Sequence, residues 1–169
     1  MKLPGSQYPI TLHFVAREPS RLRKMLSELD EHGRYRTFFY QDPSQLLGKM
    51  NLPRWHGRGM QLYFIQWESL HEVHPNTAAG FIRRLARWIN PEHIGLYAKD
   101  KHAAKAQKLA QHMNVPYIPA NVNFQHRLEN FVKSRQSRFV FTRLKRRMML
   151  LSVIFLLLMG AVIFVFLQP

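Results

Sequence analysis

The feature that most constrains the fold of this chain is a regular alternation between two kinds of segment. Short apolar runs rich in β-branched and aromatic residues alternate five times with longer stretches in which apolar residues recur every three to four positions. The short runs indicate strands, and the longer period indicates helices that bury one face. We therefore expect an α/β fold with a doubly wound, five-stranded parallel (βα)5 sheet.

The expected strands lie at residues 10–15, 35–40, 60–67, 93–98 and 115–118. The near-continuous apolarity of the third strand favours a central position with both faces covered. The expected helices lie at residues 19–32, 43–50, 76–89 and 100–113, and a last helix begins near Val122 with a break near Ser137. Functional groups in such folds sit at the carboxyl ends of the strands.

An uninterrupted apolar run occupies residues 148–167, with no charge and no proline. As a helix it spans about 30 Å, the thickness of the hydrocarbon core of a bilayer. The basic residues Arg143, Lys145, Arg146 and Arg147 precede the run, and basic flanks stay cytoplasmic. We expect one transmembrane helix, in a single-pass, tail-anchored protein of the bacterial inner membrane whose N-terminal domain is cytoplasmic. A buried core helix is the alternative interpretation.

The length and the charge of the chain indicate its domain boundaries and its partners. We expect an α/β domain at residues 1–136, a basic juxtamembrane segment at 137–147 and the transmembrane helix at 148–167. The chain carries 25 Lys+Arg against 10 Asp+Glu, a formal charge of +15. Each basic residue beside an anionic leaflet contributes about 1 kcal/mol, so anionic lipids are the expected partner and nucleic acid is the less favoured one.

Three stretches carry a resemblance to a known family. They are LHFVAREPSRLRKML at 12–26, MQLYFIQWESL at 60–70 and LYAKDKHAAKAQKLAQHMNVPYI at 96–118. In this order they resemble the first strand and helix, the third strand, and the fourth strand through the fifth strand of the receiver domain of bacterial response regulators. The resemblance covers about residues 9 to 136, and it implies a flavodoxin-like fold.

The resemblance also implies a phosphoryl-transfer site whose chemical groups are replaced. Receivers use an acidic pair to hold magnesium, a carboxylate to accept the phosphoryl group, a small hydroxyl and a lysine. The corresponding positions here hold Ala16 and Arg17, Gln66, Tyr97 and Ala120. We therefore expect no catalytic residue, no metal and no cofactor.

The same resemblance implies a docking face for a protein partner. Receivers dock partners through the fourth helix, the fifth strand and the fifth helix. The corresponding surface contains Lys101, Lys105, Lys108 and Gln111, which suit an acidic partner. The chain is then a non-phosphorylatable, receiver-like module that acts as a protein-interaction or regulatory element, with its oligomeric state undetermined.

Two other functions remain open. A sensor would bind an anionic ligand, a nucleotide or a phospholipid headgroup, through Arg17, Arg21, Arg54 and Arg58. A small hydrolase would use His56, His71 or His74, and the last two also have the spacing of a partial metal site without an evident third ligand. Most of the remaining histidines are interpreted as solvated or helix-end residues. The absence of cysteine excludes disulfides, thiolate metal centres and cysteine nucleophiles.

Overall fold

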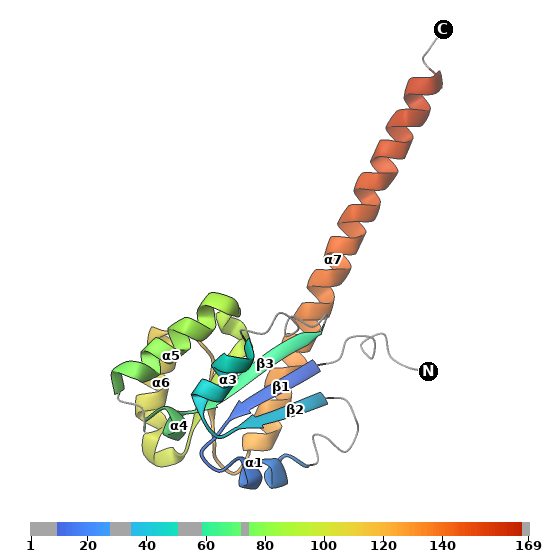
Figure 1. Cartoon of the computed structure of the whole chain (residues 1–169). Coiled ribbons are helices and arrows are strands. Elements are labelled where there is room, and N and C mark those ends of the chain that lie inside the picture. Colours follow the sequence, from blue (N-terminus) through green and yellow to red (C-terminus); the bar gives the residue numbers. More distant parts are fainter. Residues whose placement is uncertain (1–9, 28–34, 51–58, 72–74, 167–169) are drawn as a thin grey trace. The chain divides into compact units, whose positions relative to one another are not determined.

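The computed structural model contains a five-stranded, all-parallel sheet with the strand order β2-β1-β3-β4-β5 (Figure 1). It describes residues 10–27, 35–50, 59–71 and 75–166, without the side chains of 71, 75–77 and 160–166. The strands are β1 (Ile10–Val15), β2 (Tyr35–Tyr40), β3 (Met60–Gln66), β4 (Ile94–Ala98) and β5 (Tyr117–Pro119). The order is that of flavodoxin-like doubly wound sheets, so the expected fold class of the domain is confirmed. Strand β3 is central, as its apolarity predicts.

The helices follow the strands in the expected alternation. They are α1 (Pro19–Met25), α3 (Pro43–Met50), α4 (Trp67–His71), α5 (Pro75–Trp88), α6 (Ala103–His112) and α7 (Phe124–Phe166), with short 3-10 helices η3 (Pro91–His93) and η4 (Asp100–His102). Several expectations were wrong in detail: β4 begins at Ile94 instead of residue 93, β5 is Tyr117–Pro119 instead of 115–118, and α4 is a helix that was not expected. Trp67 begins α4 instead of ending β3, and α7 continues through Ser137 without the expected break.

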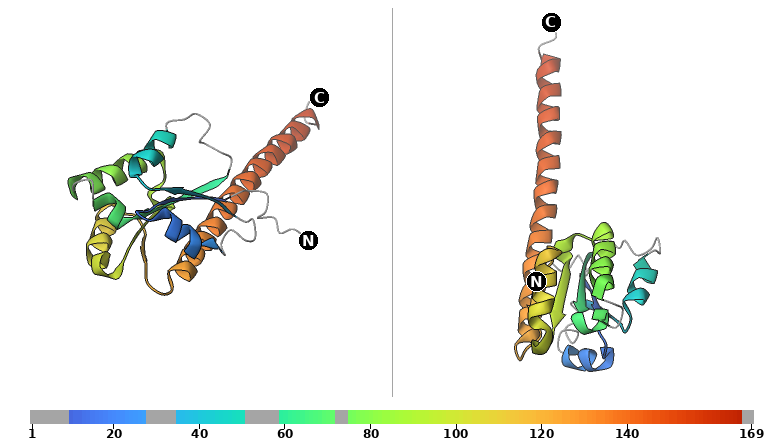
Figure 2. Two further views of the ribbon diagram at one scale, coloured as in Figure 1. Left: turned by 60° about the horizontal axis from the view of Figure 1, so that its bottom comes forward. Right: turned by 90° about the vertical axis from the view of Figure 1, so that its left-hand side faces the viewer.

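Opposite faces of the sheet bury different helices, because successive side chains of a strand point to opposite sides. One face packs residues of β3 and β4, such as Ile65 and Leu96, against Leu46 of α3, Leu85 of α5 and Ala106 of α6. The other face is covered by α1 and by the first turns of α7 (Figure 2).

The face under α1 and α7 has its own buried apolar residues. Leu22 and Leu26 come from the region of α1, and Leu128 and Val132 come from α7. The Phe131 ring of α7 meets the Phe64 ring edge-on, with the centroids 5.7 Å apart. The first turns of α7 are therefore part of the core of the α/β domain.

Contacts divide the chain into two compact units, Met1–Lys133 and Ser134–Pro169. The first unit holds the sheet. In the second, the large apolar side chains from Met148 to Met159 are 46% to 70% exposed. Side chains of the expected membrane span beyond Met159 lie outside the described residues. In the part of the chain that the structure describes, no helix has an apolar stretch long enough to cross a membrane.

Candidate functional site

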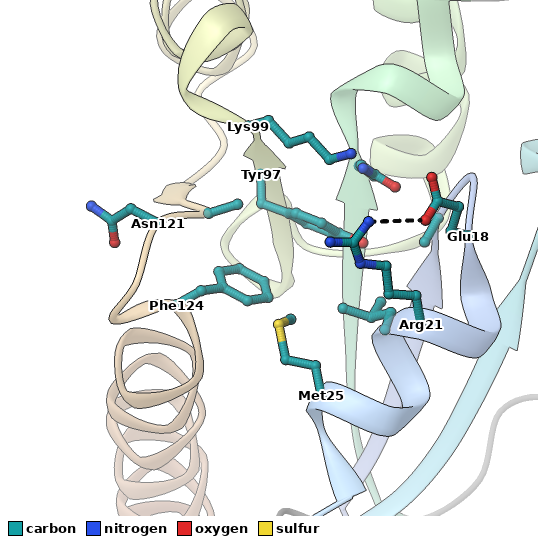
Figure 3. A pocket seen from close by; sticks show the side chains of 11 residues that line it. Glu18, Arg21, Met25, Tyr97, Lys99, Asn121 and Phe124 are labelled. Carbon is teal, nitrogen blue, oxygen red and sulfur yellow. Dashed lines mark hydrogen bonds and ion pairs between the residues drawn. The ribbon is translucent and has the colours of Figure 1, made fainter.

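A pocket of about 220 Å³ opens at the carboxyl ends of the strands, entirely within the first unit (Figure 3). It lies beside neighbouring strands β1 and β3, where the strand order reverses and doubly wound folds bind their ligands. The lining residues come from the segment after β1, α1, the ends of β3 and β4, and the segment after β5. They are Ala16, Glu18, Arg21, Leu22, Met25, Gln66, Tyr97, Lys99, Ala120, Asn121 and Phe124.

The local sequence explains why α1 begins at the rim of this pocket. Backbone hydrogen bonds hold the chain in the sheet as far as Ala16, whose N–H donates to the carbonyl of Tyr40 at 2.9 Å. Pro19 then opens α1, a position where its missing N–H costs nothing. The Leu22 N–H donates to the Glu18 carbonyl at 3.1 Å, and this bond closes the first helical turn. The first turns of α1 therefore contribute directly to the pocket wall.

Four of the five residues that the receiver resemblance singled out line the pocket together: Ala16, Gln66, Tyr97 and Ala120. The fifth, Arg17, is exposed and is absent from the lining. Its backbone N–H donates to the side-chain oxygen Oε1 of Gln66 at 3.0 Å. This bond ties the end of β1 to the end of β3 and occupies the amide oxygen of Gln66.

Tyr97 forms a closed wall of the pocket. Its side chain is buried, and its hydroxyl donates to the carbonyl of Val15 at 3.4 Å. Its ring packs against Phe124, with the centroids 5.1 Å apart. Burial, reinforced by the charge of Glu68, raises the pKa of Tyr97 well above its ordinary value. The phenol therefore remains protonated and serves as a hydrogen-bond donor.

Two cationic side chains reach into the pocket from different elements. Lys99 follows β4, and its backbone N–H donates to Oε1 of Glu68 at 3.0 Å, which fixes the position of the strand end. Arg21 stands on α1, and its Nη1 lies 3.5 Å from Oε2 of Glu18. In Figure 3 the Lys99 and Arg21 side chains extend toward the middle of the pocket from opposite sides. Two cations against one carboxylate make the lining electropositive.

Apolar side chains line another part of the pocket. Leu22 and Met25 come from α1, and Phe124 opens α7. Met25 is 46% exposed, whereas Leu22 and Phe124 are buried. Asn121 also belongs to the lining, although Figure 3 shows its amide pointing away from the other labelled side chains. The pocket thus combines a charged part with an apolar part.

The donor set of the pocket suits a divalent cation poorly. Among the described lining residues, Glu18 alone carries a carboxylate, and that carboxylate is already paired with Arg21. Magnesium sites rest on one or more carboxylates with further oxygen ligands. Within the described ranges, no group of three or more histidine, aspartate or glutamate side chains is arranged to hold a metal ion.

The other residues singled out in the sequence lie elsewhere or outside the described residues. Lys101, Lys105, Lys108 and Gln111 are all exposed, on η4 and α6. Of the basic residues before the apolar run, Lys145, Arg146 and Arg147 are exposed, and Arg143 is half-buried, with its guanidinium carbon 4.5 Å from the centre of the Phe139 ring. Arg54, His56, Arg58 and His74 are outside the described residues, as is the side chain of His71.

Sequence reasoning missed several lining residues, notably Glu18, Met25, Lys99 and Phe124. Lys99 carried a usable signal, because it directly follows the fourth strand, at the edge where ligands bind in such sheets. Phe124 carried none, since an aromatic residue early in an amphipathic helix is expected in the core. Its role in the pocket depends on how α7 packs on the sheet.

Comparison with known proteins adds no family to this geometry. No protein-family model matches the chain, and no curated protein matches its sequence. Doubly wound sheets host many unrelated activities, so the fold does not fix the function. The function has to be argued from the residues at the strand ends.

Proposed function

We propose that this chain is a membrane-anchored, receiver-like binding module without phosphoryl-transfer chemistry. The observation that carries the proposal is Gln66, which stands where the receiver resemblance places the phosphoacceptor. Its amide cannot form the acyl phosphate that a carboxylate forms, and its oxygen already accepts a hydrogen bond from the backbone of Arg17 at 3.0 Å.

The surroundings of Gln66 support the same conclusion. Ala16 and Ala120 bring only methyl groups to positions where receivers carry a metal-binding acid and a lysine. Arg21 and Lys99 add positive charge near the place where magnesium would have to bind. Both the coordination and the electrostatics of the pocket therefore oppose a receiver-type reaction.

A protein partner is the proposed target of the module, through the basic face of η4 and α6. Lys105 and Lys108 are three residues apart on α6, a spacing that puts them on one side of that helix, and Lys101 precedes them on η4. All three are exposed, as is Gln111 one turn further on. Such a face is complementary to an acidic surface and speeds association with it.

Membrane attachment is proposed from the apolar run at residues 148–167 and its basic flank. In the second unit, the described side chains from Met148 to Met159 are apolar except for Ser152, on every side of the helix. A helix that is apolar all round belongs in an apolar surrounding. Because basic flanks favour the cytoplasmic side, the proposal has the α/β domain at the cytoplasmic face of a bacterial inner membrane.

Incubation of the full chain with radiolabelled acetyl phosphate and Mg²⁺ tests the central part of the proposal. We expect no hydroxylamine-sensitive label, under conditions that label a phosphorylatable receiver domain. The Q66D variant should also remain unlabelled, because a carboxylate alone does not supply the missing metal ligand and lysine. Acyl phosphate on the wild-type chain would contradict the proposal.

A charge-reversal pair tests the docking face. The triple variant K101E/K105E/K108E should lose cross-linking to an acidic partner in bacterial membranes. The matched control is R83E/R84E/R87E, which reverses the same number of exposed cations on α5. If both variants retain the partner, or if both lose it, the face of η4 and α6 is not the docking site.

Carbonate extraction of bacterial membranes tests the anchor. The full chain should stay in the membrane pellet, and a variant that ends at residue 147 should move to the supernatant. Recovery of the full chain in the supernatant would exclude a membrane-spanning segment at residues 148–167.

A further inference from the structure

We propose that the pocket at the strand ends binds a small organic anion with an apolar part, such as an aromatic carboxylate or an aromatic phosphate monoester. This inference goes beyond the proposed function, because a ligand in this pocket requires neither the membrane nor a protein partner. It rests on the size of the pocket and on the separation of its charged and apolar walls.

The size of the pocket sets an upper limit on the ligand. Its volume of about 220 Å³ is below the roughly 300–1,000 Å³ that is typical of sites for drug-sized molecules. A single ring with one anionic group is therefore the suitable scale. A whole dinucleotide would have to extend beyond the described walls.

The charged wall of the pocket, formed by Lys99 and Arg21, favours an anionic ligand. The Lys99 ammonium has no carboxylate within salt-bridge distance among the described residues, and Arg21 approaches from the opposite side (Figure 3). A carboxylate or phosphate between them would form charge-assisted hydrogen bonds, which are stronger than neutral ones. The bond from Glu18 holds the Arg21 side chain over the pocket but also competes with an incoming anion.

The apolar wall selects for a hydrophobic group on the same ligand. Leu22, Met25 and Phe124 provide this wall. Met25 is partly exposed and has a flexible thioether side chain, so it can adjust to the shape of a ring. Tyr97 is buried, bonded to Val15 and packed against Phe124, so its ring is a fixed part of the lining. An anion without an apolar part leaves this wall exposed to water.

Calorimetric titration of the full chain in detergent micelles with four probes tests the proposal. The probes are phenyl phosphate, benzoate, inorganic phosphate and benzyl alcohol. Phenyl phosphate should bind about tenfold or more tightly than inorganic phosphate, which lacks the ring, and than benzyl alcohol, which lacks the charge. Equal affinity for phosphate and phenyl phosphate, or tighter binding of benzyl alcohol, would overturn the proposal.

Variants of the charged wall sharpen this test. K99Q should weaken phenyl phosphate binding about tenfold, because one charge-assisted bond is lost. E18Q should strengthen it, because Arg21 no longer has a competing carboxylate. An unchanged affinity in both variants would show that the anion does not bind between these side chains.

A pocket-filling pair locates the binding site independently of charge. A120F places a ring in the pocket and should abolish phenyl phosphate binding, whereas A104F, at an exposed position of α6, should leave it unchanged. The ¹³C-methyl NMR signal of Met25, assigned through M25L, should shift on titration. If other methionine signals shift and that of Met25 does not, the ligand binds elsewhere. These outcomes are independent of the acetyl phosphate and membrane tests, so either proposal can fail alone.

Discussion

Two regions of the α/β domain contain polar side chains, which are buried among aromatic rings in one region and exposed to solvent in the other. The first, called the ring layer here, consists of His13, Phe38, Tyr40 and Tyr63 on β1, β2 and β3. The His13 ring stacks on Tyr63 with centroids 4.7 Å apart and on Phe38 at 5.3 Å, and its Nδ1 lies 3.3 Å from the Tyr40 hydroxyl. The second region is the pocket, where Lys99 and Arg21 reach into open space.

Access to water explains the difference. His13 is 1% exposed, and burial, reinforced by the charge of Lys49, lowers its pKa to about 3, so the ring stays neutral. In the pocket, Lys99 and Arg21 keep their charges in contact with solvent. A polar side chain closed in by rings stabilises the fold, whereas one beside an open cavity remains able to bind a ligand.

The largest expected effect comes from emptying the ring layer. Y63A removes a side chain that is 2% exposed and stacks on His13, so the free energy of unfolding should fall by about 3–5 kcal/mol. K99A in the pocket should change it by less than about 0.5 kcal/mol. Urea unfolding of both variants measures the contrast. Similar losses in both would mean that the two regions do not differ in their structural role.

Overpacking at Gly95 of β4 should have the next largest effect. A Cβ at Gly95 would lie 3.0 Å from Cδ1 of Phe64 and 3.2 Å from Cδ1 of Ile118, so G95V should cost about 3 kcal/mol. Among the described residues, Gly48 in α3 has no neighbour within 4 Å of its Cβ position, and G48A should stabilise the chain by about 0.5–1 kcal/mol. Thermal denaturation distinguishes the two. If G95V unfolds at the same temperature as the wild-type chain, Phe64 and Ile118 can move aside and the expected overpacking does not occur.

The neutral His13 predicts a pH dependence of stability. Its pKa is about 3 in the folded chain and near its ordinary 6.5 in the unfolded chain, so the unfolded state binds the extra proton between these values. The free energy of unfolding should therefore fall by about 2 kcal/mol from pH 6.5 to pH 4.5 through this residue. H13F should lack this contribution in urea titrations at both pH values. An identical pH dependence in H13F would place the effect on other groups.

The smallest effect concerns the ion pair at the pocket rim. Glu18 and Arg21 are both exposed, and such pairs contribute little to stability. E18Q should change the free energy of unfolding by less than about 0.5 kcal/mol, while altering anion binding as described above. A stability loss of more than about 1 kcal/mol would make this pair a structural element comparable to the ring layer.

Part of the candidate site followed from the sequence. The receiver resemblance named Ala16, Gln66, Tyr97 and Ala120, and all four line one pocket. Parallel strands bring their carboxyl ends to one edge of the sheet, so residues at strand ends can be placed together without knowledge of side-chain packing. The walls supplied by helices could not be placed in this way, because Met25 and Phe124 reach the pocket only through the way α1 and α7 pack on the sheet.

His13 is a residue whose surroundings could not be predicted from the sequence. The sequence assigns no role to this residue within the expected strand at 10–15, and the structure buries it in the middle of β1. The register pairs His13 with Phe38 and with Tyr63, which places aromatic rings on both sides of it. A histidine within an apolar strand gives no local sign of the rings that its neighbouring strands will contribute.

The sequence by itself determined the alternation of strands and helices and the central place of β3, because these depend on local periodicity and residue type. Only the tertiary structure decided which polar residues are enclosed and which face a cavity. Strand register sets the neighbours of His13, and helix packing sets the walls around Lys99. Both arise from contacts between residues far apart in the chain, and local sequence does not encode them.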